Sequence, residues 1–283
     1  MESVRTGVLY VVATPIGNLA DMTHRAVQIL SSVHRIAAED TRHSRHLLEH
    51  YNIRTPTTSY HEHNEEKAAA DLLTHLINGE DIALISDAGT PMISDPGFTL
   101  TQKARAAGIK VVPIPGPSAV IAALSASGLP VDRFFFEGFL PAKSSARRSR
   151  LEALCNYPHT LAFYESPHRI AATLADAAAV LGGQRSGVIA RELTKIHETI
   201  RGDTLENLCL WQSQDSHQSK GEFVLLISGN PEPVTLSEEE QWIDRLMTAL
   251  TRELPVKQAV AIAMEVTGRR KNELYRRGLG DKS

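Results

Sequence analysis

The chain has 283 residues, of which 42% are hydrophobic and 22% charged, so it is long enough for two cores and its composition argues against disorder. A net charge of −3 gives no general attraction to a polyanion, so any contact with nucleic acid must come from local basic patches. Cys155 and Cys209 form no C-x-x-C pair, which argues against a disulfide framework or a zinc ribbon. Without a signal peptide or an apolar run of about 20 residues, we expect a cytoplasmic protein with no membrane segment.

Short apolar runs alternate with longer amphipathic stretches in the first half of the chain. In chain order the sequence predicts a strand at 7–14, a helix at 23–32, a helix at 65–78, a strand at 81–86, a helix at 97–107, a strand at 110–114 and a helix at 120–127. Apolar strands that alternate with helices indicate a sheet covered on both faces. We therefore expect residues 1–127 to form an α/β domain.

The pattern pauses at Gly128–Arg133, which we interpret as an interdomain joint. It then resumes with predicted strands at 134–138, 160–164, 187–191 and 222–228 and a helix at 167–181. We expect residues 128–232 to form a second α/β domain.

Residues 233–283 have a different, all-helical pattern. Ser237 and Glu240 have capping-box spacing, Pro255 suits the start of a second helix, and Gly268 separates it from a third. The tail is either a helix-turn-helix module or a cap on the second domain, and the sequence favours neither.

The segment Ser86-Asp-Ala-Gly-Thr-Pro-Met-Ile-Ser-Asp-Pro-Gly97 directly follows a predicted strand. Open α/β sheets bind ligands at that position, outside the carboxyl ends of the strands. Gly89 would let the backbone approach a ligand, and Asp87 and Thr90 could form hydrogen bonds to it. The alternative is an ordinary polar connector, although two prolines, two aspartates and two glycines favour a binding loop.

Four other segments also follow predicted strands: Thr14–Asn18 (TPIGN), Pro115–Ala119 (PGPSA), Tyr164–Arg169 (YESPHR) and Arg191–Glu198 (RELTKIHE). None matches the dinucleotide fingerprint or the P-loop. The last two bring carboxylates and cations to one sheet edge, which could equally be a surface salt-bridge cluster.

Two basic clusters stand out against the slightly acidic whole. Lys143, Arg147, Arg148 and Arg150 occupy a Ser-rich segment that we expect to be a loop able to move onto RNA, although a solvated helix face is the usual fate of such a run. The tail carries Arg269, Arg270, Lys271, Arg276 and Arg277. The histidines around His61 complete no zinc spacing, so we predict no metal site.

The motifs TPIGN, AAEDTR (Ala37–Arg42), SDAGTPMISDPG, PGPSA, YESPHR and RELTKIHE follow one another in this order. Over about residues 7–229 they resemble the tetrapyrrole-methylase-like family, and within it the enzymes that methylate ribosomal RNA. The resemblance implies two α/β domains with S-adenosylmethionine in a cofactor cleft between them, usually in a homodimer. It also implies transfer of a methyl group to the ribose 2′-hydroxyl of a cytidine in the decoding region of 16S rRNA, as free RNA or in the small ribosomal subunit.

Carried over by motif, the expected cofactor contacts are Pro15, Gly17, Asp87, Gly89, Thr90, Ile93, Ser118, Ala119, Tyr164 and Leu193. A hydroxyl nucleophile needs a general base, for which we select Asp40 and Glu165, with Lys195 stabilising the alkoxide. Arg42 could hold a phosphate of the RNA, as could the run from Lys143 to Arg150.

Two other functions compete with this hypothesis. A tetrapyrrole C-methyltransferase would share the fold but would need neither the basic run nor the helical tail. A non-catalytic nucleic-acid regulator that binds through the tail would leave the loops at the strand ends unexplained.

Overall fold

The computed structural model describes residues 5–214, 220–230 and 238–279. The chain divides into two compact units, one over Met1–Pro231 and the other over Glu232–Ser283. None of the helices in the described part of the chain is long and apolar enough to cross a membrane.

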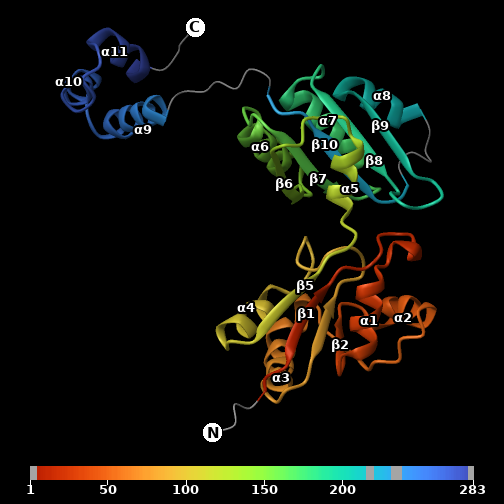
Figure 1. The fold of residues 1–283 in the computed structure, drawn as a ribbon. Coiled ribbons are helices and arrows are strands. Elements are labelled where there is room, and N and C mark those ends of the chain that lie inside the picture. Colours follow the sequence, from red (N-terminus) through yellow and green to blue (C-terminus); the bar gives the residue numbers. More distant parts are fainter. Residues whose placement is uncertain (1–4, 215–219, 231–237, 280–283) are drawn as a thin grey trace. The chain divides into compact units, whose positions relative to one another are not determined.

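The first unit contains two five-stranded sheets, and the first sheet is entirely parallel (Figure 1). Its strand order is β3-β2-β4-β1-β5. The strands are β1 (Val8–Val12), β2 (Arg35–Ala38), β3 (Thr57–Ser59), β4 (Ile82–Ile85) and β5 (Lys110–Ile114). Because all five strands run in the same direction, the loops that follow them leave the sheet at one edge, where open α/β sheets bind ligands.

Helices cover both faces of this sheet, as the continuous apolar strands predict. They are α1 (His24–Ser32) and α2 (Thr41–His50) on one face, and α3 (Glu65–Ile77) and α4 (Phe98–Ala106) on the other. Successive strand residues point to opposite faces, so Ile36 packs with α1 and α2 whereas Ala37 packs with α3 and α4.

The second sheet is mixed, with strand order β6-β7-β10-β8-β9. Its strands are β6 (Phe134–Phe139), β7 (Thr160–Glu165), β8 (Ser186–Arg191), β9 (Thr199–Thr204) and β10 (Phe223–Ile227). β10 is antiparallel to β7 and to β8, with Phe223 opposite both Glu165 and Arg191. The carboxyl ends of β7 and β8 therefore lie at the same edge of the sheet as the start of β10.

One face of the second sheet is covered by α6 (Ser144–Leu154), α7 (Ile170–Leu181) and α8 (Leu205–Gln214). The other face packs against α5 (Ala119–Ala126), which follows β5. Ile16, in the loop after β1, belongs to the same apolar cluster as Val120 of α5 and Val224 of β10. This cluster joins the loop edge of the first sheet to the second sheet.

The second unit consists of α9 (Glu238–Glu253), α10 (Val256–Thr267) and α11 (Lys271–Leu279). Its apolar residues pack on one another and form a separate core of Ile243, Met247, Val260, Ala263 and Leu274. Pro255 occupies the N-cap position of α10, and Gly268, with φ of +67°, ends the helix in the left-handed region that favours glycine. The predicted capping box begins at Ser237, which lies outside the described residues.

Several elements were not predicted from the sequence, namely β2, β3, β9, α2, α6 and α8. β2 and β3 have four and three residues, and β3 (Thr57–Ser59) contains no apolar residue that could mark it as a strand. The loop expected around Lys143–Arg150 is wrong, because this segment forms the first turns of α6.

Candidate functional site

Three loops of the first sheet are tied together around Gly89. Its N–H donates to the carbonyl oxygen of Thr14 at 3.0 Å, and its carbonyl accepts from the N–H of Thr14 at 2.9 Å. The hydroxyl of Thr90 donates to the carbonyl of Pro117 at 3.0 Å. Gly89 has φ of +79°, which a side chain would disfavour. The loops after β1, β4 and β5 therefore form one fixed surface.

A cavity of about 290 Å³ opens beside this surface and extends to the edge of the second sheet. Its volume is close to the lower end of the range for small-molecule sites, about 300–1,000 Å³. The loop surface contributes Ile16 and Asp95, and the second sheet contributes Phe139 and Ala190. Six of the ten expected cofactor contacts also line it, namely Gly89, Thr90, Ile93, Ala119, Tyr164 and Leu193. We refer to it as the central cavity.

Backbone strain is concentrated in two loops that contribute residues to the central cavity. Of the five non-glycine residues with positive φ in the described ranges, Met92 and Ser94 lie in the loop after β4, with φ of +71° and +69°. Glu192 and Thr194 lie in the loop after β8, with φ of +51° and +67°. Such conformations are costly and cluster at binding sites and active sites.

Asp95 places a partly buried carboxyl group in the wall of the central cavity. Burial, together with the nearby carboxylates of Glu39 and Asp87, raises its pKa to about 6, against a hydrogen bond from Ser86 that lowers it. Burial also raises the pKa of Glu39, which lies next to Asp87. This side of the site is therefore complementary to a cation, since a positive ligand would relieve the repulsion among these carboxylates.

Tyr164 anchors the opposite wall. Burial raises the pKa of its phenol, whose oxygen accepts hydrogen bonds from the backbone N–H of Val120 and the hydroxyl of Ser118. Its ring stacks edge-on against Phe136 and Phe139. These contacts fix the start of α5 against β7, with Ser118 at the N-cap position.

The sequence model of the tetrapyrrole (corrin/porphyrin) methylases matches residues 8–209. A relative from Pseudomonas aeruginosa, named ribosomal RNA small subunit methyltransferase I, is 54% identical over 277 residues, covering 96% of this chain and 97% of its own. A relative of the same name from Vibrio cholerae is 53% identical over 96% of this chain and 94% of its own. The chain belongs to the ribosomal RNA small subunit methyltransferase I family, within the tetrapyrrole methylases.

Known proteins also resemble the tail and the fold of this chain. The model of the RsmI C-terminal HTH domain matches residues 236–282. Uroporphyrin-III C-methyltransferase from Thermus thermophilus, in a structure complexed with S-adenyl homocysteine, has a TM-score of 0.54 at 17% identity, covering 78% of this chain and 97% of its own. A diphthine synthase structure has a TM-score of 0.58 at 14% identity, covering 78% of this chain and 89% of its own. At these identities the two structures show the fold alone.

The remaining residues carried over from the methyltransferase family do not line the central cavity. Pro15, Gly17 and Asp87 line a second cavity of about 480 Å³, together with residues of α2. Ser118 contacts the central cavity indirectly, through Tyr164. The role of these residues as cofactor contacts stays a prediction.

Asp40, Glu165 and Lys195, the three residues selected as catalytic, lie at three different cavities. Asp40 is the N-cap of α2, and hydrogen bonds from the backbone and guanidinium of Arg42 lower its pKa. Lys195 lies between Glu192 and Glu222, at 3.0 and 3.1 Å. Burial lowers the pKa of Lys195, but the two carboxylates outweigh burial and raise it. Lys195 therefore stays protonated, as a group that stabilises an alkoxide must.

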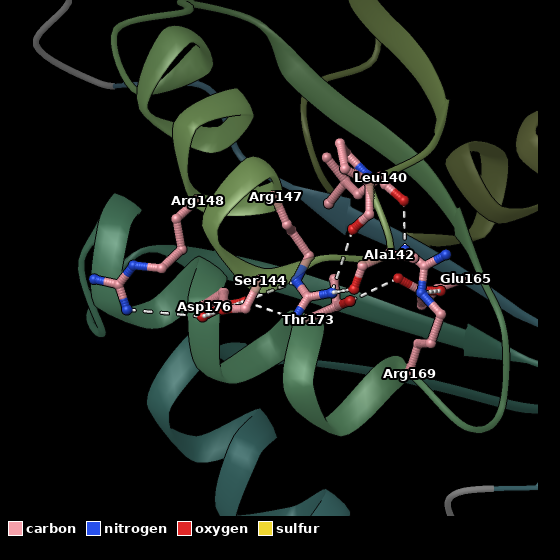
Figure 2. Close-up of polar contacts among 10 residues, drawn as sticks. Leu140, Ala142, Ser144, Arg147, Arg148, Glu165, Arg169, Thr173 and Asp176 are labelled. Atoms are coloured by element: carbon pink, nitrogen blue, oxygen red, sulfur yellow. Dashed lines mark hydrogen bonds and ion pairs between the residues drawn. The ribbon is translucent and has the colours of Figure 1, made fainter.

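Glu165 lines the central cavity, but its carboxylate is occupied by neighbours (Figure 2). Its side chain is fully buried, accepts from the hydroxyl of Thr173 at 2.6 Å and from the N–H of Ser166 at 2.8 Å, and lies 3.2 Å from Arg169. Arg169 also donates to the carbonyl of Leu140. These contacts indicate that Glu165 holds the loop between β7 and α7.

Arg147 was predicted to contact RNA phosphate, and the structure contradicts this prediction. Figure 2 shows its guanidinium directed into the protein, where it pairs with Asp176 at 2.7 Å and donates to the carbonyl of Ala142 at 3.1 Å. Its side chain is 4% exposed, so it cannot reach a phosphate. This burial could not be predicted from the sequence, because the partner carboxylate lies 29 positions away.

The other cations that were predicted to contact RNA differ in how free they are to bind a phosphate. Arg150 forms a two-pronged pair with Glu137, at 2.7 and 2.6 Å. Arg148 is 47% exposed and 3.7 Å from Asp176, and Lys143 is exposed at the start of α6. In the tail, Arg277 pairs with Asp244 at 2.6 Å and joins α11 to α9. Lys143 and Arg148 are therefore the better candidates for contact with an anion.

Asp95 is the functional candidate that sequence reasoning missed. It belongs to the same motif as Asp87, three residues after the strained Met92. Its place in this motif is the one feature of the sequence that could have identified it. Residues with left-handed backbone lie between Asp87 and Asp95, so the sequence does not show which aspartate faces the cavity.

Proposed function

We propose that this protein transfers a methyl group from S-adenosylmethionine to the ribose 2′-hydroxyl of a cytidine in the decoding region of 16S rRNA. The observation that carries the proposal is that 54% identity to a ribosomal RNA small subunit methyltransferase I extends over 96% of the chain. A match confined to the two α/β sheets would be shared with methylases of other substrates, whereas this one includes the tail.

The residues of the central cavity fit the proposed cofactor. Ile16, Ile93 and Leu193 offer apolar walls to an adenine ring. The carboxylate of Asp95, with Glu39 and Asp87 nearby, offers negative charge to a sulfonium and an ammonium group. The backbone around Gly89 can approach the ligand closely because the residue has no side chain.

When bound, S-adenosylmethionine supplies a methyl group attached to positively charged sulfur. The protein's own tasks are to exclude water, to hold the ribose in line and to remove the proton of the 2′-hydroxyl. The apolar walls of the central cavity serve the first task. A dry site favours the reaction because the charges of the attacking oxygen and the sulfur neutralise each other.

For proton removal we favour Asp40 over Glu165. The side chain of Asp40 is 40% exposed and lines a cavity that also includes Asp87, whereas the side chain of Glu165 is fully buried. Lys195, held positive by Glu192 and Glu222, would stabilise the alkoxide. Arg42, Lys143 and Arg148 would contact RNA phosphates, and a homodimer in the cytoplasm is part of the proposal.

The assignment of Asp40 can be tested without losing the helix cap. Asparagine caps helices about as well as aspartate, so Asp40→Asn should leave the melting temperature unchanged. Loss of a general base should lower kcat by about 10²- to 10⁴-fold. A normal kcat in this variant would remove Asp40 from the mechanism.

Mass mapping of small-subunit RNA from a bacterial strain that lacks this protein tests the function itself. We expect one cytidine to lose a ribose methyl group, and the wild-type gene to restore it. The competing C-methyltransferase hypothesis predicts unchanged RNA and a change in the absorbance of uroporphyrinogen mixed with the protein and S-adenosylmethionine.

A further inference from the structure

A second cavity lies on the other side of the loops that bound the central cavity. It has a volume of about 480 Å³ and is lined by Pro15, Gly17, Arg42, Ser44, His46 and Asp87, among others. We call it the Arg42 pocket. The two cavities share a wall: Ile16 lines the central cavity, whereas its neighbours Pro15 and Gly17 line the Arg42 pocket. A ligand in this pocket is therefore next to the cofactor cavity but separate from it.

Ser44 is the unusual residue of the Arg42 pocket. It is 3% exposed, and its hydroxyl has no hydrogen-bond partner among the described residues. Leaving a buried hydroxyl unpaired destabilises the fold, and such groups are rare in native structures. A ligand that hydrogen-bonds to Ser44 would explain why a hydroxyl is retained there.

The charges around the pocket are of both signs. The side chain of Arg42 is 88% exposed at the start of α2, and His43 and His46 are exposed on the same helix. Asp87 also lines the pocket and accepts a hydrogen bond from the backbone N–H of Asp40 at 3.0 Å. A carboxylate beside the basic groups disfavours a simple anion. It suits a ligand that presents both a phosphate and hydrogen-bond donors, as a nucleotide does.

We propose that the Arg42 pocket receives a nucleotide of the RNA substrate that flanks the methylated one. Its phosphate is held by Arg42 and His46, and its base or ribose contacts Ser44 and Asp87. The pocket does not hold the reacting ribose, because the Pro15–Gly17 segment separates it from the central cavity. This inference rests on the proposed function.

The test compares three variants of the full-length protein on one helix. Ser44→Ala removes the unpaired hydroxyl, Arg42→Gln removes the exposed cation, and Arg45→Gln is the matched control, because Arg45 is exposed on α2 but does not line the pocket. Methyl transfer is measured with labelled S-adenosylmethionine on small ribosomal subunits from cells that lack the protein. Cofactor affinity is measured by calorimetry and stability by thermal melting.

We expect Ser44→Ala to raise the KM for small subunits about 3- to 10-fold, the range of one neutral hydrogen bond, while its melting temperature stays the same or rises. For Arg42→Gln we expect a higher KM and, with a single-stranded RNA probe, a log–log salt slope smaller by about 0.7. Arg45→Gln should behave as wild type, and all three should bind S-adenosylmethionine normally.

Three results would overturn the inference. An unchanged KM in Ser44→Ala would show that nothing in the substrate contacts the hydroxyl. A lower melting temperature in that variant would assign the hydroxyl a structural role. Weaker binding of S-adenosylmethionine in Ser44→Ala or Arg42→Gln would assign the pocket to the cofactor. If instead the wild-type protein binds the cofactor but methylates no RNA, the proposed function fails before the pocket is tested.

Discussion

Asp95 makes binding of a cationic ligand depend on pH. Its pKa is raised from 3.8 to about 6, so the carboxyl group is largely protonated at about pH 5 and ionised at about pH 7.5. Without ligand, the stability it contributes is fully present below pH 3.8 and is lost as the pH rises through about 6. Affinity for a cation changes in the opposite direction, because the ionised carboxylate attracts the ligand.

We therefore expect the affinity for S-adenosylmethionine to rise between about pH 5 and pH 7 and then to level off. S-adenosylhomocysteine, which lacks the sulfonium charge, should show a weaker dependence on pH. In Asp95→Asn the affinities for the two ligands should depend on pH to the same extent. Calorimetry of both ligands over this pH range measures the effect, and the same pH profile in wild type and Asp95→Asn would exclude Asp95 as its source.

The Gly89 loop can be tested with a control for backbone strain. Gly89→Val should cost about 1–2 kcal/mol of folding stability, because a side chain disfavours its φ of +79°. It should also weaken S-adenosylmethionine binding, because the residue lines the central cavity. Gly108→Val is the control, since Gly108 has φ of +73° and a Cβ there meets open space. If both variants bind the cofactor normally, Gly89 does not lie in its site.

At this scale the sequence predicted which loops form the site better than it predicted which side chains enter it. Among the expected cofactor contacts, Thr90 and Leu193 line the central cavity, whereas Pro15 and Gly17 line the neighbouring one. The reason is geometric: adjacent residues of an extended segment point to opposite sides, so the first loop serves two cavities. The alternation cannot be followed through the loop after β4, where left-handed residues interrupt it.

At the scale of elements, the basic residues between Lys143 and Arg150 lie on a helix, α6, and not in a loop. A helix gives each of these residues a different environment, so Arg147 is buried while Lys143 and Arg148 face solvent. The sequence predicted a single loop because this segment contains Ser144, Ser145 and Ser149, which are common in loops. The first residue of α6 that packs in the apolar core is Leu151, so the early turns show no apolar pattern. In contrast, β5, α1 and α3 were predicted to within a residue or two, because their apolar residues follow the pattern of a strand or of a helix.

The buried and exposed arginines of α6 should respond differently to mutation. Arg147→Ala leaves Asp176 buried without its main partner, which should cost about 3–5 kcal/mol of stability and lower the melting temperature. The pair Lys143→Ala and Arg148→Ala should leave stability nearly unchanged and reduce the salt slope of RNA binding by about 0.7 per lost phosphate contact. Thermal melting and fluorescence anisotropy with single-stranded RNA measure both effects. An unchanged salt slope in the double variant would leave α6 outside the RNA interface.

At the scale of the whole molecule, the tail is a unit with its own core. The side chains of Ile243 and Met247 are buried among residues of α10 and α11, and Trp242 is 43% exposed. We propose that this unit docks RNA, and the alternative is that it caps the second sheet. The two interpretations make different predictions for truncation after Pro233.

If the tail docks RNA, the truncated protein should fold, bind S-adenosylmethionine normally and methylate small subunits with a KM raised about tenfold or more, a loss of about 1.4 kcal/mol. If the tail is a structural cap, truncation should cause aggregation or a marked fall in melting temperature. Melting curves, cofactor calorimetry and steady-state kinetics on the truncated protein distinguish these outcomes. A stable core with an unchanged KM would contradict both interpretations.

Methyl transfer by the purified protein tests the central claim most directly. The protein is incubated with labelled S-adenosylmethionine and small ribosomal subunits from cells that lack it, and the RNA is digested and mapped by mass. We predict label on one cytidine, carried on the ribose, so that the adjacent phosphodiester resists alkaline cleavage. Label on a base, or the absence of label from RNA when the protein binds the cofactor, would contradict the claim.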